Sequence, residues 1–193
     1  MSQKRIIILG VLFSLLIIFI ILFFNIGKKE KPQSLSDETS LLDSEEQLVE
    51  PKETRMVTLF FLSEDDGFLH SEKREIYSEP SDIDSARQTV LELIKGSQNG
   101  YISPFPPETK LRELFLTKMG IAYVDFSSDI MENHPSGSSA EISTVYSLVN
   151  TLTHNFKSIK KVHILVDGRE QETLGGHINL SKPFLPMYDL VVQ

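Results

Sequence analysis

The hydrophobic positions of this chain fall into one unbroken run near its start and several short periodic stretches after residue 55. Residues 6–24 contain 17 Leu, Ile, Val or Phe side chains among 19 positions and no charge. As a helix this run would be about 28 Å long, close to the roughly 30 Å hydrocarbon core of a bilayer. We therefore predict a transmembrane helix over residues 6–26, preceded by a short N-terminal tail of residues 1–5.

A cleaved signal peptide is the alternative interpretation of the apolar run. A signal h-region is about 7–15 residues long and is followed by small residues at the cleavage site. Here the run is longer, ends in Phe23 and Phe24, and leads to Lys28 and Lys29 without a suitable cleavage motif. We therefore favour an uncleaved anchor. Basic residues flank the run on both sides, so the positive-inside rule does not decide its orientation. We adopt the common arrangement, with a cytoplasmic N-terminus and the rest of the chain outside.

Residues 27–55 differ from both of their neighbours in composition. Residues 32–55 carry seven acidic side chains, and their large apolar side chains are four Leu and one Val, with no aromatic residue. Such a segment cannot bury enough surface to offset the entropy of the chain. We predict an acidic disordered linker over residues 27–55, and a flexible chain of that length reaches about 30 Å.

Residues 56–193 show the periodicities of a single domain that mixes strands and helices. Stretches rich in β-branched and aromatic residues predict strands at 56–62, 111–118, 121–126 and 161–166, with further extended chain up to residue 77. Helical spacing predicts helices over 81–95 and 140–156, the first capped by Ser81 and ended by Gly96. An extended tail is expected at 174–185, and edge pairing at 188–192.

The second helix carries the most regular apolar stripe of the domain, which we expect to face the core. Its members are Ile142, Val145, Tyr146, Val149, Leu152 and Phe156. Tyr101 and Phe105 are expected to fix the proline-rich loop of residues 97–109 to the core. The acidic triplet of residues 64–66 precedes Gly67, which favours a turn over a calcium loop.

Charge and residue types exclude several functional classes. The whole chain has a net charge of −8, and no run of basic residues occurs after residue 55, which argues against nucleic-acid binding. Without cysteine there is no disulfide, cysteine nucleophile or Cys-ligated zinc. None of the five histidines has a metal-binding spacing, and His163 within a strand is expected to be a satisfied structural residue.

Recognisable catalytic or cofactor motifs are likewise missing from the sequence. No nucleophile elbow, phosphate-binding loop or dinucleotide motif occurs. Ser136 and Gly137 before the second helix could offer amides to an anion, but a simple cap is the favoured interpretation. Asp125 and Asp167 each follow a strand and could form a paired-carboxylate site, although turn formation explains them better. We therefore predict a protein that is not an enzyme and has no cofactor or metal.

Taken in order, several blocks of residues 56–185 resemble the GerMN family of sporulation and spore-germination modules. They are residues 57–62, 90–96, 120–127 (Gly-Ile-Ala-Tyr-Val-Asp-Phe-Ser), 151–153, 162–168 (Val-His-Ile-Leu-Val-Asp-Gly) and 176–184. The matching residues, to which we assign structural roles, are Gly96, Gly120, Val124, Asp125, Ser127, Thr151, Leu152, Thr153, Asp167, Gly168, Gly176, Leu180 and Pro183. The chain departs from the family in the loops at Ser97 and at residues 106–109.

The resemblance implies an α+β fold, with a mixed β-sheet and two helices packed on one face, and an extracytoplasmic location. It also implies a non-enzymatic role in assembling or binding other envelope proteins, including further copies of itself, with sporulation or germination as one setting. A small-ligand or cell-wall-glycan sensor is the alternative. A cleft lined by Tyr101, Phe105 and Tyr123 would favour that alternative.

Overall fold

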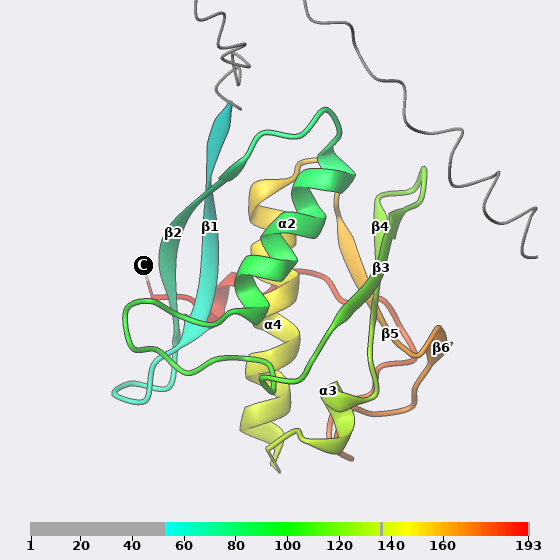
Figure 1. Ribbon diagram of the computed structural model, residues 1–193. Helices are drawn as coiled ribbons and strands as arrows, with labels where there is room; N and C mark the ends of the chain where they lie inside the picture. Colours follow the sequence, from blue (N-terminus) through cyan, green and yellow to red (C-terminus); the bar gives the residue numbers. More distant parts are fainter. Residues whose placement is uncertain (1–52, 136, 193) are drawn as a thin grey trace, which may run out of the picture. The chain divides into compact units, whose positions relative to one another are not determined.

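Figure 1 shows the computed structural model of the protein, in which residues 53–135 and 137–192 are described. The predicted tail, the predicted transmembrane helix and nearly all of the predicted linker lie outside these residues. Within the described part of the chain, no helix is long and apolar enough to cross a membrane.

The strands form two sheets rather than the single sheet that we expected. Strands β1 (Thr54–Leu62) and β2 (Leu69–Tyr77) make an antiparallel pair by themselves. The second sheet has the order β3-β4-β5-β6, and its strands are Leu111–Leu116, Ile121–Phe126, Lys161–Val166 and Arg169–Glu170. It is mixed, because β4 and β5 run parallel whereas the other neighbours are antiparallel. The α+β class and the mixed sheet are therefore confirmed.

Two long helices stand between the sheets (Figure 1). Helix α2 (Asp82–Ile94) contacts β1, β2 and β3, and helix α4 (Ser138–Asn155) contacts β1 and β5. The expectation that both helices cover one face of one sheet is thus corrected. Since each sheet packs against the same helices, one hydrophobic core serves the whole domain.

The ends of α2 follow the sequence signals. The Ser81 hydroxyl accepts a hydrogen bond from the Asp84 amide at 3.1 Å and caps the first turn. Gly96 adopts a left-handed φ of +86°, and its amide donates to the Leu93 carbonyl. This conformation ends the helix and turns the chain into the following loop.

Helix α4 is buried on more sides than its apolar stripe predicts. Most of the predicted stripe lies in the core, but Ile142 and Tyr146 are only partly buried. Small polar side chains are buried as well, namely Ser143, Thr144, Ser147, Asn150 and Thr151. A helix with neighbours on both sides needs small or hydrogen-bonded residues on its second buried face, and apolar periodicity does not show that face.

Tight turns join the strands of the second sheet. Gly120 in the β3–β4 turn has a φ of +79°. Asp167 and Gly168, with φ values of +51° and +74°, form the two-residue turn between β5 and β6. Two successive left-handed residues match the twist of a hairpin.

Short or irregular segments complete the fold. Helix α3 (Asp129–Glu132) and the two-residue strand β6 were not predicted. The predicted tail of residues 174–185 is mostly irregular, with Leu174 and Leu180 fully buried. At the C-terminal end, a short 3-10 helix η1 (Tyr188–Leu190) precedes the amide of Val192, which donates to the Leu69 carbonyl at 2.9 Å. The expected edge pairing is therefore confirmed at this point.

Candidate functional site

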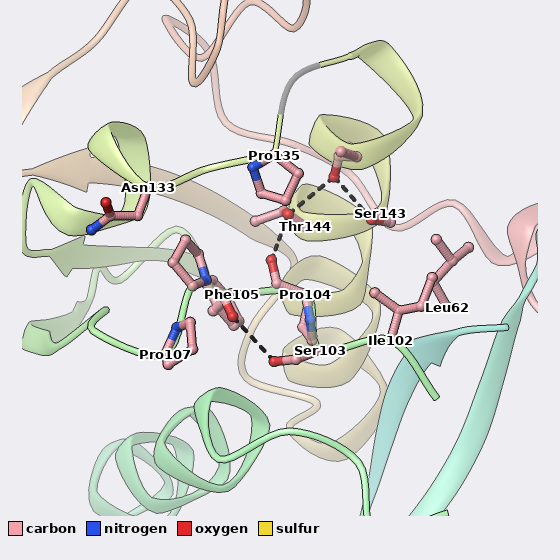
Figure 2. Close-up of a pocket in the computed structure, with 12 residues that line it drawn as sticks. Leu62, Ile102, Ser103, Pro104, Phe105, Pro107, Asn133, Pro135, Ser143 and Thr144 are labelled. Carbon is pink, nitrogen blue, oxygen red and sulfur yellow. Dashed lines mark hydrogen bonds between the residues drawn. The ribbon is translucent and has the colours of Figure 1, made fainter. Parts of the chain in front are cut away.

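An apolar pocket of about 490 Å³ opens beside the first turns of α4 (Figure 2). Its walls come from four places, namely the end of β1, the loop after α2, the stretch between α3 and α4, and α4 itself. Four prolines line it, at positions 104, 106, 107 and 135, together with Phe105 and Ile102. Because proline fixes its own backbone angle, walls of this composition change shape little.

The hydroxyl groups around the pocket bond to other groups of the protein, whereas the exposed Asn133 side chain lines the pocket without such a bond among the described residues. The Thr144 hydroxyl lies 2.6 Å from the Pro104 carbonyl and 2.8 Å from His134 Nε2. Ser143 donates to the Ala140 carbonyl at 2.9 Å, and Ser103 donates to that of Phe105 at 3.1 Å. The hydroxyl groups that line the pocket are thus already used within the protein, and its inner surface suits an apolar group.

The three aromatic residues expected around a ligand cleft do not meet. Only Phe105 lines the pocket. The ring of Tyr101 lies against His70, with 5.1 Å between their centroids, and Tyr123 stacks on Phe115 at 5.0 Å. The predicted anchoring role of Phe105 is confirmed, since it is buried in the core, and Tyr101 packs against that core.

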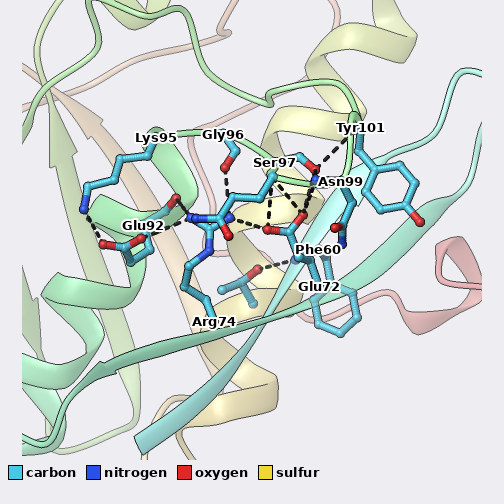
Figure 3. A network of polar contacts seen from close by, with 11 residues as sticks. Phe60, Glu72, Arg74, Glu92, Lys95, Gly96, Ser97, Asn99 and Tyr101 are labelled. Atoms are coloured by element: carbon cyan, nitrogen blue, oxygen red, sulfur yellow. Dashed lines mark hydrogen bonds and ion pairs between the residues drawn. The ribbon is translucent and has the colours of Figure 1, made fainter. Parts of the chain in front are cut away.

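Glu72 on β2 is a buried carboxylate that organises the loop after α2 (Figure 3). It pairs with Arg74 and accepts hydrogen bonds from the Ser97 hydroxyl at 2.7 Å and from the Gln98 amide at 3.1 Å. Burial by itself would raise the pKa of Glu72, but the hydrogen bonds from Ser97, Arg74 and Gln98 outweigh it and lower the pKa. The residue is therefore held as an anion.

Arg74 extends this network to the end of α2. Its guanidinium donates to the Gly96 carbonyl at 3.2 Å and pairs with Glu92 Oε2 at 3.1 Å (Figure 3). Glu92 also pairs with Lys95. The network joins β2, the last turn of α2 and the loop that leads into the pocket.

Glu141, in the first turn of α4, is fully buried and holds the segment that follows β6. Its carboxylate accepts hydrogen bonds from the amides of Ile178 at 2.9 Å and His177 at 3.1 Å, and contacts the His177 ring at 2.7 Å. Burial acts to raise the pKa of Glu141, but these bonds and one from the Gly175 amide lower it. A side chain on Gly175 would lie 3.0 Å from Glu141 Oε1, so the glycine leaves room for this contact.

The fold brings Asp125 and Asp167 together around the positively charged side chain of Arg112. The Arg112 guanidinium pairs with Asp167, and its Nε lies 3.4 Å from Asp125 Oδ2. Asp125 also accepts a hydrogen bond from the Gly168 amide at 2.8 Å. We expected each aspartate to bond its own turn, whereas Asp125 in fact fixes the turn of the neighbouring hairpin. Bound in this way, the pair is a structural ion cluster.

His163 is buried against the Tyr123 ring, at 5.1 Å between centroids, and its Nε2 lies 3.6 Å from Glu170 Oε1. Among the described residues, neither ring nitrogen has a hydrogen-bond partner. The expectation of a hydrogen-bonded structural histidine is therefore corrected to one held by packing. No group of three or more His, Asp or Glu side chains in the described residues could hold a metal ion.

The family-matching residues occupy four kinds of position in this structure, of which the first three are these. Val124, Leu152 and Leu180 are fully buried in the core. Five residues have positive φ angles, namely Gly96, Gly120, Asp167, Gly168 and Gly176. Pro183 is partly buried and precedes Phe184, which pairs with Val162 through backbone hydrogen bonds.

The polar residues of that set make specific hydrogen bonds. Ser127 accepts one from the Lys110 amide at 3.0 Å, and Thr151 accepts one from the Phe60 amide at 3.1 Å. The Thr153 hydroxyl lies 2.7 Å from the Val149 carbonyl within α4. Asp125 has been described above.

Sequence reasoning missed four polar residues that hold the domain together. Besides Glu72 and Glu141, these are Asn150 and Asn155 on α4. Asn155 pairs with both backbone groups of Thr58, at 2.9 and 2.7 Å, and Asn150 pairs with both of Met187, at 2.9 and 3.0 Å. These partners of Asn150 and Asn155 lie 37 and 97 positions away, so local sequence carries no signal of them.

Comparison with known families decides the relationship of the chain. A family model named Germane, described as sporulation and spore germination, matches residues 58–172. The chain belongs to the Germane family. The resemblance to GerMN modules is thereby confirmed, as a single copy.

Solved structures agree with membership of the Germane family. A protein of Clostridium perfringens, provisionally described as a lipoprotein, is 28% identical with a TM-score of 0.50, covering 68% of this chain and 87% of that one. The first GerMN domain of the sporulation protein GerM from Bacillus subtilis is 22% identical with a TM-score of 0.53, covering 70% and 99% respectively.

The tandem GerMN domains of the same Bacillus subtilis protein are 24% identical, with a TM-score of 0.58, covering 71% of this chain. This chain spans 48% of that tandem structure. At such identities, both GerM structures support the fold alone. Among curated proteins, none matches this chain.

Proposed function

We propose that this Germane-family chain is a single-pass membrane protein whose domain lies outside the cytoplasm and binds other envelope proteins without catalysing a reaction. The apolar run of residues 6–24 supports membrane attachment. The similarity to a Clostridium perfringens protein described as a lipoprotein supports the same location. The family's description makes sporulation or germination the expected setting.

The observation that carries this proposal is the uncovered apolar surface of the β3–β4 hairpin. Leu114 and Val124 face the core, so their neighbours Phe115 and Tyr123 lie on the opposite face of the sheet. Phe115 is 48% exposed and stacks on Tyr123, and Met119 in the turn is 82% exposed. Large side chains that stay exposed on an ordered hairpin are typical of a protein-binding surface.

The sheet edges offer less to a partner than this face does. At β2, the Leu69 carbonyl already accepts from Val192, and the Tyr77 amide donates to Gln88 at 3.1 Å. At β3, the Leu114 carbonyl accepts from Arg87 at 2.9 Å. Side chains and the C-terminal segment thus occupy edge groups that strand addition would need.

The carboxylates support a role without catalysis. A general acid at neutral pH requires a raised pKa. Burial of Glu72 and Glu141 is outweighed by hydrogen bonds that lower both pKa values. Asp125 is bound by Arg112 and the Gly168 amide. The buried acids therefore serve the fold.

Photo-crosslinking in intact cells tests the proposal. A photoreactive phenylalanine analogue at Met119 should give adducts with one or a few other envelope proteins. The same analogue at Glu172, which is exposed in the segment after β6, is the matched control and should give no such adducts. Identical adducts at both positions, or none at Met119, would contradict the proposal.

A ligand-sensing module is the second candidate, because the pocket volume of about 490 Å³ lies within the range of small-molecule sites. Its inner surface argues against a glycan, since a sugar needs many hydrogen bonds and the wall hydroxyls are already used. Calorimetric titration with a muropeptide separates the two candidates. Saturable binding that Ala140→Phe abolishes would favour the glycan sensor.

A further inference from the structure

The apolar pocket beside α4 is a preformed cavity. The loop that enters it is held by Glu72 through Ser97 and Gln98. Inside the pocket, Thr144 on α4 fixes the Pro104 carbonyl at 2.6 Å (Figure 2). A partner that enters such a pocket therefore loses little affinity to ordering of the walls.

The walls define what fits inside. Leu62, Ile102, Phe105 and Ala140 supply apolar surface, and the wall hydroxyls are bonded to backbone carbonyls. A charged group would lose its hydration there, and no residue that lines the pocket carries an opposite charge. The occupant is consequently an uncharged, apolar group about the size of one or two side chains.

The charges on the wall segments are of one sign. Residues 96–109 and 127–144 contain no Lys or Arg, although the exposed Lys95 and Lys110 directly flank the first segment. Their acidic residues are Glu108, Asp129, Glu132 and Glu141. Of these, Glu141 is buried and already accepts hydrogen bonds from the Ile178 and His177 amides. Glu108 and Glu132 are exposed, and each adjoins a residue that lines the pocket. Such a rim attracts cations and repels the anionic surface of a bilayer.

We propose that this pocket binds an apolar anchor side chain of a partner protein whose neighbouring residues are basic. The inference rests on the proposed protein-binding function and adds a second surface with a stated chemistry. A short peptide segment matches the charges better than an acyl chain from anionic lipid does. The hairpin face around Met119 and this pocket are tested by separate experiments, so one can fail while the other stands.

The test uses the full chain in phosphatidylcholine nanodiscs, with methyl resonances of Ile102 and Ala140 as reporters. Three capped peptides serve as probes, namely Lys-Lys-Leu-Phe-Lys-Lys, Glu-Glu-Leu-Phe-Glu-Glu and Lys-Lys-Ser-Ser-Lys-Lys. The first should shift both reporters saturably. The second should bind at least about tenfold more weakly, because like charges oppose docking. The third should leave the reporters unchanged, since it lacks the anchor.

Two sets of variants test separately the binding of the apolar side chain in the pocket and the effect of the acidic residues Glu108 and Glu132 beside it. Ala140→Phe fills the cavity and should abolish the Ile102 shift, whereas Ser138→Phe, on the same first turn but outside the lining, should retain it. The double substitution Glu108→Lys with Glu132→Lys alters exposed residues and should reverse the preference between the lysine and glutamate peptides. Equal binding of all three peptides would overturn the proposal, as would an unchanged preference in the double variant.

Discussion

At the scale of single residues, Gly120 is the described glycine with the least room for a side chain. Its carbonyl accepts hydrogen bonds from the amides of Lys160 at 2.7 Å and Lys161 at 3.2 Å, so the β3–β4 turn lies directly on the start of β5. A Cβ atom there would approach Lys160 Cγ to 2.8 Å and the Ser158 carbonyl oxygen to 3.0 Å. Glycine is therefore required by its left-handed backbone and by space.

Gly120→Ala should lower the free energy of unfolding by about 2–4 kcal/mol, because strain and the close approach to backbone add together. Gly67→Ala is the control, since Gly67 has a φ of +73° but nothing within 4 Å of the added Cβ. Urea unfolding of the purified protein measures both. Equal losses in the two variants would show that the contact with residues 158–160 is unimportant.

Glu141 also acts through its position, as the buried anion that binds the backbone of residues 175–178. Replacement by glutamine keeps the shape but places an amide donor against N–H groups, which leaves donors unpaired. Glu141→Gln should therefore cost about 1–3 kcal/mol at pH 7. Glu132→Gln, at an exposed position, should cost almost nothing.

The same contact gives a pH dependence with a definite sign. Because the folded protein lowers the pKa of Glu141, its stabilising effect is complete above the ordinary glutamate pKa of about 4.3 and is lost as the pH falls through the lower folded value. Glu72 acts in the same direction. Urea midpoints measured from pH 7 down to pH 3 should fall most steeply below about pH 4.3, with a smaller decrease in Glu141→Gln.

At the scale of elements, α4 behaves like an additional neighbour of β1. Among the described residues, β1 pairs along its length with β2 and makes a single bridge from Leu62 to Ile102, and α4 supplies hydrogen-bonding atoms to its other edge. Thr151 accepts from the Phe60 amide, and Asn155 pairs with both backbone groups of Thr58. A two-stranded sheet is only marginally stable by itself. The hydrogen bonds from the α4 side chains to β1 therefore help to hold this strand in place.

Asn155→Ala should remove that pairing and leave the Thr58 amide and carbonyl without protein partners. We expect a loss of about 1–3 kcal/mol in stability and faster hydrogen exchange at the Thr58 amide. Asn99→Ala is the control, because the Asn99 side chain is exposed and no hydrogen bond of its amide group is found among the described residues. An unchanged exchange rate at the Thr58 amide would show that water replaces the Asn155 side chain as its hydrogen-bond partner without loss of protection.

The elements that the sequence predicted well are those with local signals. Helix α2 has its serine cap and its glycine stop, and the β3–β4 hairpin has its glycine turn. The division into two sheets had no such signal, since it depends on which strands pair. The polar residues buried on α4 were missed for a related reason, because their partners come from β1 and the C-terminal segment. The pocket was likewise unpredictable, because loop conformation brings its four walls together.

At the scale of the whole molecule, the sequence makes a separate prediction about attachment. Residues 6–24 are expected to insert with a gain of about 5–10 kcal/mol. Leu15→Arg together with Leu16→Arg should cost about 5–7 kcal/mol at the centre of such a helix and shift the protein toward the soluble fraction. The matched control is Leu41→Arg with Leu42→Arg, in the predicted linker. Carbonate extraction of membranes measures the distribution, and equal behaviour of the two variants would contradict the anchor.

The double-sided burial of α4 limits how this domain can be divided or recombined. The helix is a wall shared by the β1–β2 pair and the four-stranded sheet, so any cut between the sheets exposes half of that wall, whichever fragment keeps it. Each fragment would then present apolar surface, and separating α4 from β1 would also leave the Asn155 amide without its partners on Thr58. The smallest portion that can be duplicated, grafted or exchanged between relatives is therefore the whole stretch from β1 to the segment that binds Leu69.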